Sequence, residues 1–427
     1  MIYMVPIAPV AVFGVVYYVS SGMTVLVYLV GALAMTFSAI SYREMAKSPT
    51  TAGSVYAYVR HGIGQRSGFV AGWMILLDYL IAPAFLYVLL GVAMHSQFPG
   101  VSQEVWIVAG AIVVTAVNLM GVTVTVRASI LILIIQMVLI LTFLVFAIIR
   151  LAQGDVHLSW TPLFDSSLFS FSTIGNSLPI VLFAYIGFDV IAVFKAEAIG
   201  GSQTVARATT IVMVAMTALF AVEVYAASLF VPAEGFSSEE AMNTAFYDIS
   251  AVVVGDWFRA VLAFVVGSIV IIANAAVSQA GTGRVLVGMA RDSKLPKVLA
   301  YVSPRNGVPV VSVLAVALIS LTIALGQAGR LEFLTTVVTF GAVAAYVMLH
   351  AAVIWGLGRN SGSSIFAHRI SPVLGSGILI YALWSASTDA KILGLTWLAV
   401  GIIIALSLGN NSPELDLADP GSVESAG

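Results

Sequence analysis

The sequence contains no cysteine and very little charge. Without cysteine, no disulfide framework, cysteine metal site or thiol nucleophile can form. Charged residues make up 9% of the 427 residues, and 18 Lys plus Arg against 20 Asp plus Glu give a formal net charge of −2. Soluble domains carry about 25% charged residues, and disordered or nucleic-acid-binding chains also need abundant charge. These classes are excluded, and the near-neutral balance indicates no charged macromolecular partner.

The sequence also lacks the short motifs of several enzyme classes. It has no Gly-x-x-x-x-Gly-Lys-Ser/Thr phosphate loop, no His-Glu-x-x-His metal helix and no Gly-x-Ser-x-Gly nucleophile elbow. The histidines lie far apart along the chain, at His61, His95, His157, His350 and His368. We therefore expect no enzymatic activity, no metal site and no cofactor.

Long apolar runs dominate what remains, because 60% of the residues are hydrophobic. A helix that crosses a bilayer needs about 20 mainly apolar residues, so the fold class is predicted to be an all-α polytopic membrane protein with about twelve transmembrane helices. The predicted spans are residues 2–20, 23–44, 67–94, 105–122, 128–150, 173–195, 208–231, 258–280, 308–326, 332–356, 371–387 and 391–408. Residues 1–408 then form one transmembrane domain. Residues 409–427 carry prolines and acids without an apolar period and are predicted to be a disordered cytoplasmic tail.

The distribution of Lys and Arg predicts the orientation, because cytoplasmic loops carry an excess of both. With the N-terminus inside, all but four of the 18 lie on the cytoplasmic side, the exceptions being Arg150, Arg259, Arg330 and Lys391. Both termini are therefore predicted to be cytoplasmic, in the cell (inner) membrane. The first span begins at Met1 without a polar or basic flank, so we expect the natural chain to start upstream and this helix to be truncated.

Two predicted spans contain strong helix breakers at corresponding positions, Pro6 and Pro9 in the first and Gly187 in the sixth. Such paired interruptions indicate a transporter's binding site, where freed carbonyls accept from an ammonium group and freed amides donate to an anion. The alternative is that Pro and Gly are simply frequent in membrane helices. Asn274 and Ser278, one turn apart in the eighth span, either face the same site or bridge helices. The candidate substrate-binding residues are Val5, Pro6, Ile7, Ala8, Phe183, Ala184, Tyr185, Ile186, Gly187, Asn274 and Ser278.

Several ionisable residues lie within or beside the spans, where each needs a partner or a function. Asp78 in the third span is either a structural acceptor or a proton or substrate ligand. Asp189 follows the break in the sixth span and either caps a half-helix or binds a proton or ligand. His350 in the tenth span either titrates or packs with hydrogen bonds. Glu197, at the inner end of the sixth span, is a candidate gate residue.

Several motifs in order along the chain resemble the amino acid–polyamine–organocation (APC) superfamily of permeases, and in particular its putrescine-importing and related bacterial members. The resemblance implies a five-plus-five inverted repeat (APC/LeuT-type) with broken first and sixth helices and two further C-terminal helices. It also implies alternating access and proton-coupled movement of amino acids or amines. The motifs are residues 3–6 (YMVP), 13–14 (FG), 52–60 (AGSVYAYVR), 68–73 (GFVAGW), 77–79 (LDY), 187–189 (GFD), 283–286 (GRVL), 289–292 (MARD), 295–296 (LP), 308–309 (VP) and 340–342 (FGA).

Departures from the family pattern leave the substrate and the coupling open. The segment with Pro6 and Pro9 offers fewer amides than the Gly-rich break of many family members, which disfavours an α-carboxylate. Ala11 stands where the putrescine importers carry an acid, which disfavours a diamine. Gln136 stands where some proton-coupled members carry a lysine. We therefore predict an amino acid or amine permease of the lipid bilayer, with protons as coupling ion. Putrescine uptake, or a transport-inactive sensor or partner subunit, is the alternative.

Glu223 lies in the seventh predicted span, and the resemblance implies that this span is peripheral to the cavity. A carboxyl at that depth needs a partner. We therefore expect Glu223 to be paired structurally with a neighbouring side chain.

Overall fold

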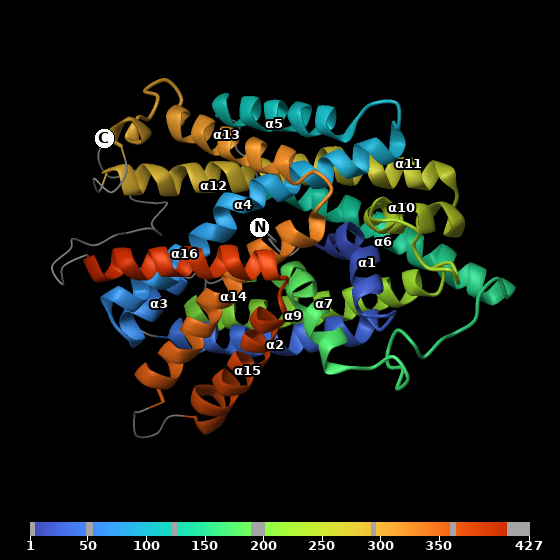
Figure 1. Cartoon of the computed structure of the whole chain (residues 1–427), viewed down its shortest axis with the longest axis horizontal. Helices are drawn as coiled ribbons and strands as arrows, with labels where there is room; N and C mark the ends of the chain where they lie inside the picture. The colour runs from blue at the N-terminus through green and yellow to red at the C-terminus, as the bar shows by residue number, and fades with distance from the viewer. Residues whose placement is uncertain are drawn as a thin grey trace.

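The computed structural model describes residues 5–47, 54–121, 126–188, 201–291, 296–358 and 364–407, and every regular element within these ranges is a helix (Figure 1). The elements are α1 (Ala8–Val19), α2 (Thr24–Met45), α3 (Val55–Gly62), α4 (Gln65–Gln97), α5 (Gln103–Leu119), α6 (Val126–Gln153), α7 (Phe171–Tyr185), α9 (Gly201–Ser228), α10 (Glu239–Val253), α11 (Asp256–Phe264), η2 (Val265–Val270), α12 (Ile271–Arg291), η3 (Lys297–Ala300), α13 (Val310–Gly326), α14 (Leu331–Gly356), η4 (Phe366–Ile370), α15 (Ser371–Ser385) and α16 (Thr388–Ser407).

The apolar runs of the sequence form the long helices, which confirms the helical membrane class. Within the described ranges, eight helical stretches are long and apolar enough to cross a membrane. They lie in α2, α4, α6, α9, the continuous stretch from α11 to α12, α14, the stretch from η4 to α15, and α16. The shorter apolar helices α1, α5, α7 and α13 overlap the remaining predicted spans.

The predicted eighth span, residues 258–280, is too short. The helix runs from Asp256 to Arg291 and contains the π-helical segment η2. The run of apolar residues ends where polar residues begin, although the helix itself continues beyond that point. The last seven residues of the predicted sixth span, 189–195, lie outside the described residues.

Two short helices, α3 and α10, fall between the predicted spans because they are amphipathic and too short to cross a bilayer. The Ser54 hydroxyl caps α3 by accepting from the Ala57 amide at 3.3 Å. The Ser238 hydroxyl caps α10 by accepting from the Ala241 amide at 3.1 Å. The two helices lie at opposite ends of the bundle (Figure 1).

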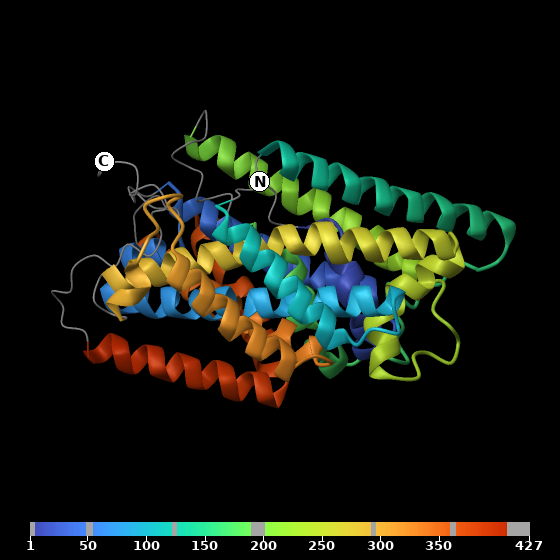
Figure 2. The same ribbon diagram turned by 90° about the horizontal axis from the view of Figure 1, so that it is seen from above.

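The 33-residue helix α4 is the centre of the bundle and packs against α14, α12, α5, α13 and α16. At a rise of 1.5 Å per residue its length is about 50 Å, more than a bilayer core is thick. Gly341 lets α14 approach α4 closely, because a Cβ there would lie 2.6 Å from the Met74 carbonyl oxygen. Figure 2 shows the long helices running in broadly the same direction.

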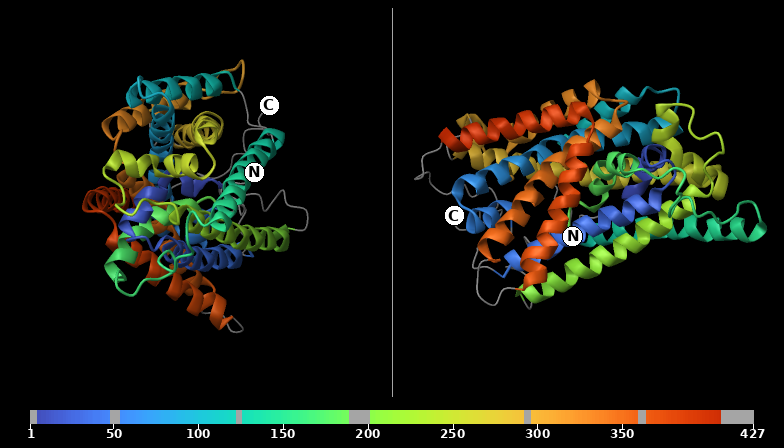
Figure 3. Two further views of the ribbon diagram at one scale, coloured as in Figure 1. Left: turned by 90° about the vertical axis from the view of Figure 1, so that its right-hand side faces the viewer. Right: turned by 60° about the horizontal axis from the view of Figure 1, so that its bottom comes forward.

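The helices α6 and α16 lie on opposite sides of the bundle (Figures 2 and 3). α6 exposes an apolar face that includes Ile134, Leu141 and Ile148, as expected for contact with lipid. α16 is attached to α4 through Trp73 and Trp397, whose rings stack with centroids 4.5 Å apart. Each indole N–H donates to the other residue's backbone carbonyl at 2.8 Å.

Candidate functional site

Helix α7 ends inside the predicted sixth span, at Tyr185. Ile186 has extended backbone angles (φ −63°, ψ 140°), and Gly187 has φ +110°. Glycine adopts such a φ without the steric cost that other residues meet, so the Ile186–Gly187 step explains where the helix stops. The last carbonyls of a helix have no intrahelical donor, and here these carbonyls lie within the bundle.

The segment before α1 is a turn, and the helix begins only at Ala8. The Ala8 amide donates to the Val5 carbonyl at 2.9 Å and the Val10 amide to the Ile7 carbonyl at 3.2 Å. The two prolines of this segment have no N–H group. Among residues 6–10, only the Ile7 amide has no acceptor within the described part of the chain. The start of α1 is therefore poor in amides for binding an anion.

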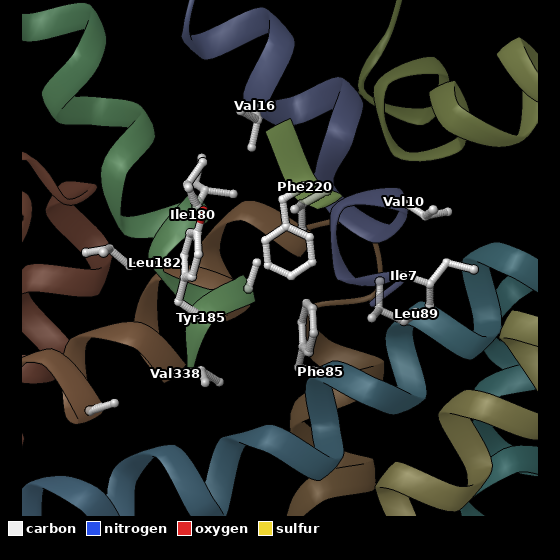
Figure 4. Packing of buried hydrophobic residues seen from close by; sticks show 14 of the residues in the cluster. Ile7, Val10, Val16, Phe85, Leu89, Ile180, Leu182, Tyr185, Phe220 and Val338 are labelled. Atoms are coloured by element: carbon white, nitrogen blue, oxygen red, sulfur yellow. The ribbon is translucent and has the colours of Figure 1, made fainter. Parts of the chain in front are cut away.

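The start of α1 and the end of α7 lie in one buried cluster with helices α4 and α9 (Figure 4). Ile7, Phe85, Tyr185 and Phe220 are at most 3% exposed. The Tyr185 ring meets the Phe220 ring edge-on at 5.4 Å between centroids, and the Phe183 ring meets Phe85 at 4.6 Å. We call these five residues the break cluster.

Tyr185 ties the end of α7 to α2. Its hydroxyl donates to the backbone carbonyl of Tyr28 at 3.0 Å. The Tyr28 ring lies 5.9 Å from the Phe220 ring and 6.3 Å from the Tyr185 ring. The last residue of α7 is therefore held by both a hydrogen bond and aromatic packing.

The electrostatics of the break favour a cation. The C-terminus of a helix carries a partial negative charge and the N-terminus a partial positive one. The C-terminal carbonyls of α7 lie beside aromatic rings, whose faces also attract cations. The start of α1 has one available amide. This arrangement can accept an ammonium group more readily than it can hold a carboxylate.

The predicted polar residues of the eighth span are on α12, which packs against α4, α5 and α13, whereas α1 and α7 pack against each other and against α14. The Asn274 amide donates to the Val270 carbonyl of its own helix at 2.8 Å. Gln279 accepts from the Asn118 amide of α5 at 2.7 Å. The structure thus shows helix bridging at Gln279, and it does not bring Asn274 or Ser278 into the break cluster.

The three predicted coupling residues within the described ranges lie on three different helices, α4, α6 and α14. Asp78 is 8% exposed and lies on α4, where a Cβ on Gly341 of α14 would be 3.1 Å from its amide nitrogen. Gln136 on α6 is 4% exposed, and its carbonyl oxygen has no donor within the described ranges. Asp189 and Glu197 lie outside the described residues.

His350 on α14 is buried between two serines of α2. Its Nε2 lies 3.2 Å from the Ser38 hydroxyl and its Nδ1 lies 2.8 Å from the Ser41 hydroxyl. The Ser38 hydroxyl also donates to the Ala34 carbonyl at 3.2 Å. Ser38 therefore accepts from Nε2–H, and Ser41 donates to Nδ1. This geometry is that of a hydrogen-bonded packing residue.

The expectation that Glu223 has a structural partner is wrong for the described residues. The residue is fully buried on α9, and neither carboxyl oxygen has a hydrogen-bond partner among them. The hydroxyl of Tyr28 is likewise buried and without such a partner. The signal in the sequence was a single acid within an apolar run, but the sequence did not indicate which side chains surround it.

A bundle of long apolar helices, with a helix that ends at its buried centre, defines a multi-pass membrane protein of the transporter class. Residues 9–357 match the family of amino acid permeases, and the chain belongs to that family, which is part of the APC superfamily. The chain is thus a permease and not an enzyme.

Relatives of this chain include transporters with different substrates. The low-affinity putrescine importer PlaP of Escherichia coli is 26% identical over 412 residues, which cover 94% of this chain and 89% of PlaP. The branched-chain amino acid permease BcaP of Lactococcus lactis is 25% identical over 425 residues, covering 90% and 86%. A methylthioribose transporter of Bacillus subtilis is 24% identical over 414 residues, covering 88% and 84%.

Proposed function

We propose that this permease is a secondary active transporter that moves a small amine or amino acid by alternating access, with protons as the coupling ion. The observation that carries the proposal is the end of α7 at Tyr185, which lies beside the start of α1 within the membrane bundle. Helix ends inside a membrane persist where they line a substrate path or are buried in protein. The aromatic residues of the break cluster then close over the substrate.

The substrate's ammonium group is proposed to bind the terminal carbonyls of α7, near Phe183 to Ile186, and the carbonyls near Val5 to Ile7. Putrescine and branched-chain amino acids, the cargoes named for two relatives, have an amino group in common. The aromatic and aliphatic side chains of the break cluster suit an apolar carbon chain next to that group. The few free amides at the start of α1 favour an amine over a substrate held by its carboxylate.

The proposed topology has twelve crossings with both termini in the cytoplasm. The end of the bundle that carries α3 also carries Arg43, Lys47, Arg60 and Arg66, near the ends of α2, α3 and α4. The opposite end carries α10, with Glu239 and Glu240 in its first turn. This separation of charge supports a cytoplasmic α3 end, because basic residues concentrate on that side. Proton coupling requires a titratable group within the bundle, for which the sequence offers Asp78 and Asp189.

The test is uptake of labelled solutes into proteoliposomes, with and without an inward proton gradient. The panel is putrescine, leucine, arginine and glutamate. We expect saturable uptake of putrescine or leucine that the gradient stimulates. Binding without flux would favour a sensor or a partner subunit. Uptake that ignores the gradient would refute the coupling, and glutamate uptake alone would refute the preference for a cation.

A further inference from the structure

Glu223 is a carboxylic acid buried in the membrane-spanning part of α9. Its exposed fraction is 0%, and neither oxygen meets a donor within the described residues. An ionised carboxylate in such a position would lack both a counter-ion and hydrogen bonds, which is strongly unfavourable. The surroundings therefore accept the neutral acid, with its proton bound.

Among the described residues, the helices packed against α9 place no cation at mid-helix beside Glu223. α9 packs against α2, α1 and α6. The charged residues of α2 and α6 lie near helix ends, α1 has none, and the other charge of α9 is near its start. These residues are Arg43, Glu44, Arg127, Arg150 and Arg207. The titratable groups next to this part of α9 include two tyrosines. The ring of Tyr28 lies 5.9 Å from that of Phe220, three residues before Glu223, and 6.3 Å from that of Tyr185.

Tyr28 connects this acid to the end of α7. Its hydroxyl is buried without a partner among the described residues, so it can donate to a carboxylate at Glu223. Its backbone carbonyl accepts the hydrogen bond from Tyr185, the last residue of α7. One residue of α2 thus packs on α9 beside Phe220, three residues before the acid, and holds the last residue of α7.

Polar side chains continue from this acid toward the end of α9. Thr24 and Ser228 lie four and five residues from Tyr28 and Glu223 on their helices, and their hydroxyls are 2.9 Å apart. If α3 is at the cytoplasmic end, this pair lies on the outer side of the acid. Hydroxyl groups can both donate and accept, so they suit the transfer of a proton.

We propose that Glu223 is a proton-binding site of this transporter, coupled to the break in α7 through Tyr28 and Tyr185. The inference rests on the proposed transport function and names Glu223, instead of Asp78 or Asp189, as the acid that coupling requires. In the conformation described here the carboxyl holds its proton. When the proton leaves, the carboxylate requires a donor, and the Tyr28 hydroxyl turns to it. That movement perturbs the α2 carbonyl that holds Tyr185, while the proton passes to water on the other side.

The test compares wild type with Glu223→Gln and Glu223→Leu in proteoliposomes, with putrescine and leucine as probes. Both substitutions replace a neutral acid with another neutral side chain, so neither leaves an unpaired charge in the bundle. Both variants are therefore expected to fold, which size-exclusion chromatography would check. We expect wild-type uptake to rise with an inward proton gradient, and both variants to lose that rise while they keep substrate exchange. Glu332→Gln, in the first turn of α14, is the matched carboxyl-to-amide control. Its uptake should still rise with the inward proton gradient.

Two further measurements keep the proposal open to refutation. Infrared spectra of the wild type should contain a band of a protonated carboxyl at neutral pH that Glu223→Gln lacks. Tyr28→Phe should weaken the response to the gradient, whereas Tyr87→Phe, at another buried tyrosine on α4, should not.

The outcomes separate this inference from the transport proposal. If wild-type protein moves no solute, the transport function fails, and the infrared band alone then decides whether Glu223 holds a proton. If wild type responds to the gradient and Glu223→Gln responds equally, Glu223 is not the coupling site. A variant that loses putrescine binding but keeps the response would make Glu223 a substrate ligand, which also overturns the proposal.

Discussion

The contact between α4 and α14 at Gly341 provides a sharp test of the packing around the site. A Cβ on Gly341 would lie 2.6 Å from the Met74 carbonyl oxygen and 3.1 Å from both the Asp78 amide nitrogen and the Leu77 Cβ. Two of these three atoms are backbone atoms of α4, which cannot rotate away. Gly341→Ala therefore has to push the two central helices apart.

The size of the effect follows from these distances. Ordinary van der Waals contact begins at 3.4 Å, so the oxygen and the new methyl group must separate by about 0.8 Å. Overpacking of a well-packed interior costs about 1–3 kcal/mol. Since Asp78 lies on the displaced stretch of α4, we also expect reduced uptake.

Thermal unfolding in detergent and proteoliposome uptake would measure both consequences. The matched control is Gly281→Ala on α12, where a Cβ would meet no atom within 4 Å. That variant should be neutral or gain up to about 1 kcal/mol from helix propensity. Equal stabilities for the two variants would refute the inferred close approach of α4 and α14.

Four other substitutions have expected outcomes. Gly187→Ala places a side chain at φ +110°, which costs about 1–3 kcal/mol of folding free energy. Uptake should fall by a larger fraction than thermal stability does, and normal uptake would contradict a role for the break. Ser41→Ala removes the donor to His350 Nδ1 and should lower the free energy of unfolding by about 1–3 kcal/mol. The pH profile of uptake should not change, and a shifted profile would indicate that His350 titrates during transport. Trp73→Phe and Trp397→Phe should each lower the free energy of unfolding by about 1 kcal/mol and expose α16 to protease. A double variant as stable as either single variant would confirm that the two hydrogen bonds act together.

The long apolar helices and the end of α7 were predictable because both depend on neighbouring residues in the chain. A run of about 20 apolar residues has few alternatives to a helix in a bilayer. A glycine after an aromatic stretch permits the backbone angles found at Gly187. The amphipathic helices α3 and α10 were missed because a search for apolar runs does not detect them.

The partners of the buried polar residues were not predictable in the same way. His350 meets Ser41, which is 309 positions away in the sequence, and Gln279 meets Asn118, which is 161 positions away. For His350, its surroundings in the sequence also allowed a titrating role. The choice depends on which helix faces which, and a single sequence does not contain that information.

The sequence by itself determined the membrane class, the positions of the apolar helices and the place where α7 stops, because hydrophobicity and backbone preference act locally along the chain. Only the tertiary structure decided which polar groups meet. It placed Tyr185 against Tyr28, enclosed His350 between two serines and left Glu223 without a partner among the described residues. The physical reason is that burial and hydrogen bonding depend on contacts between helices, which form only when distant parts of the chain pack together.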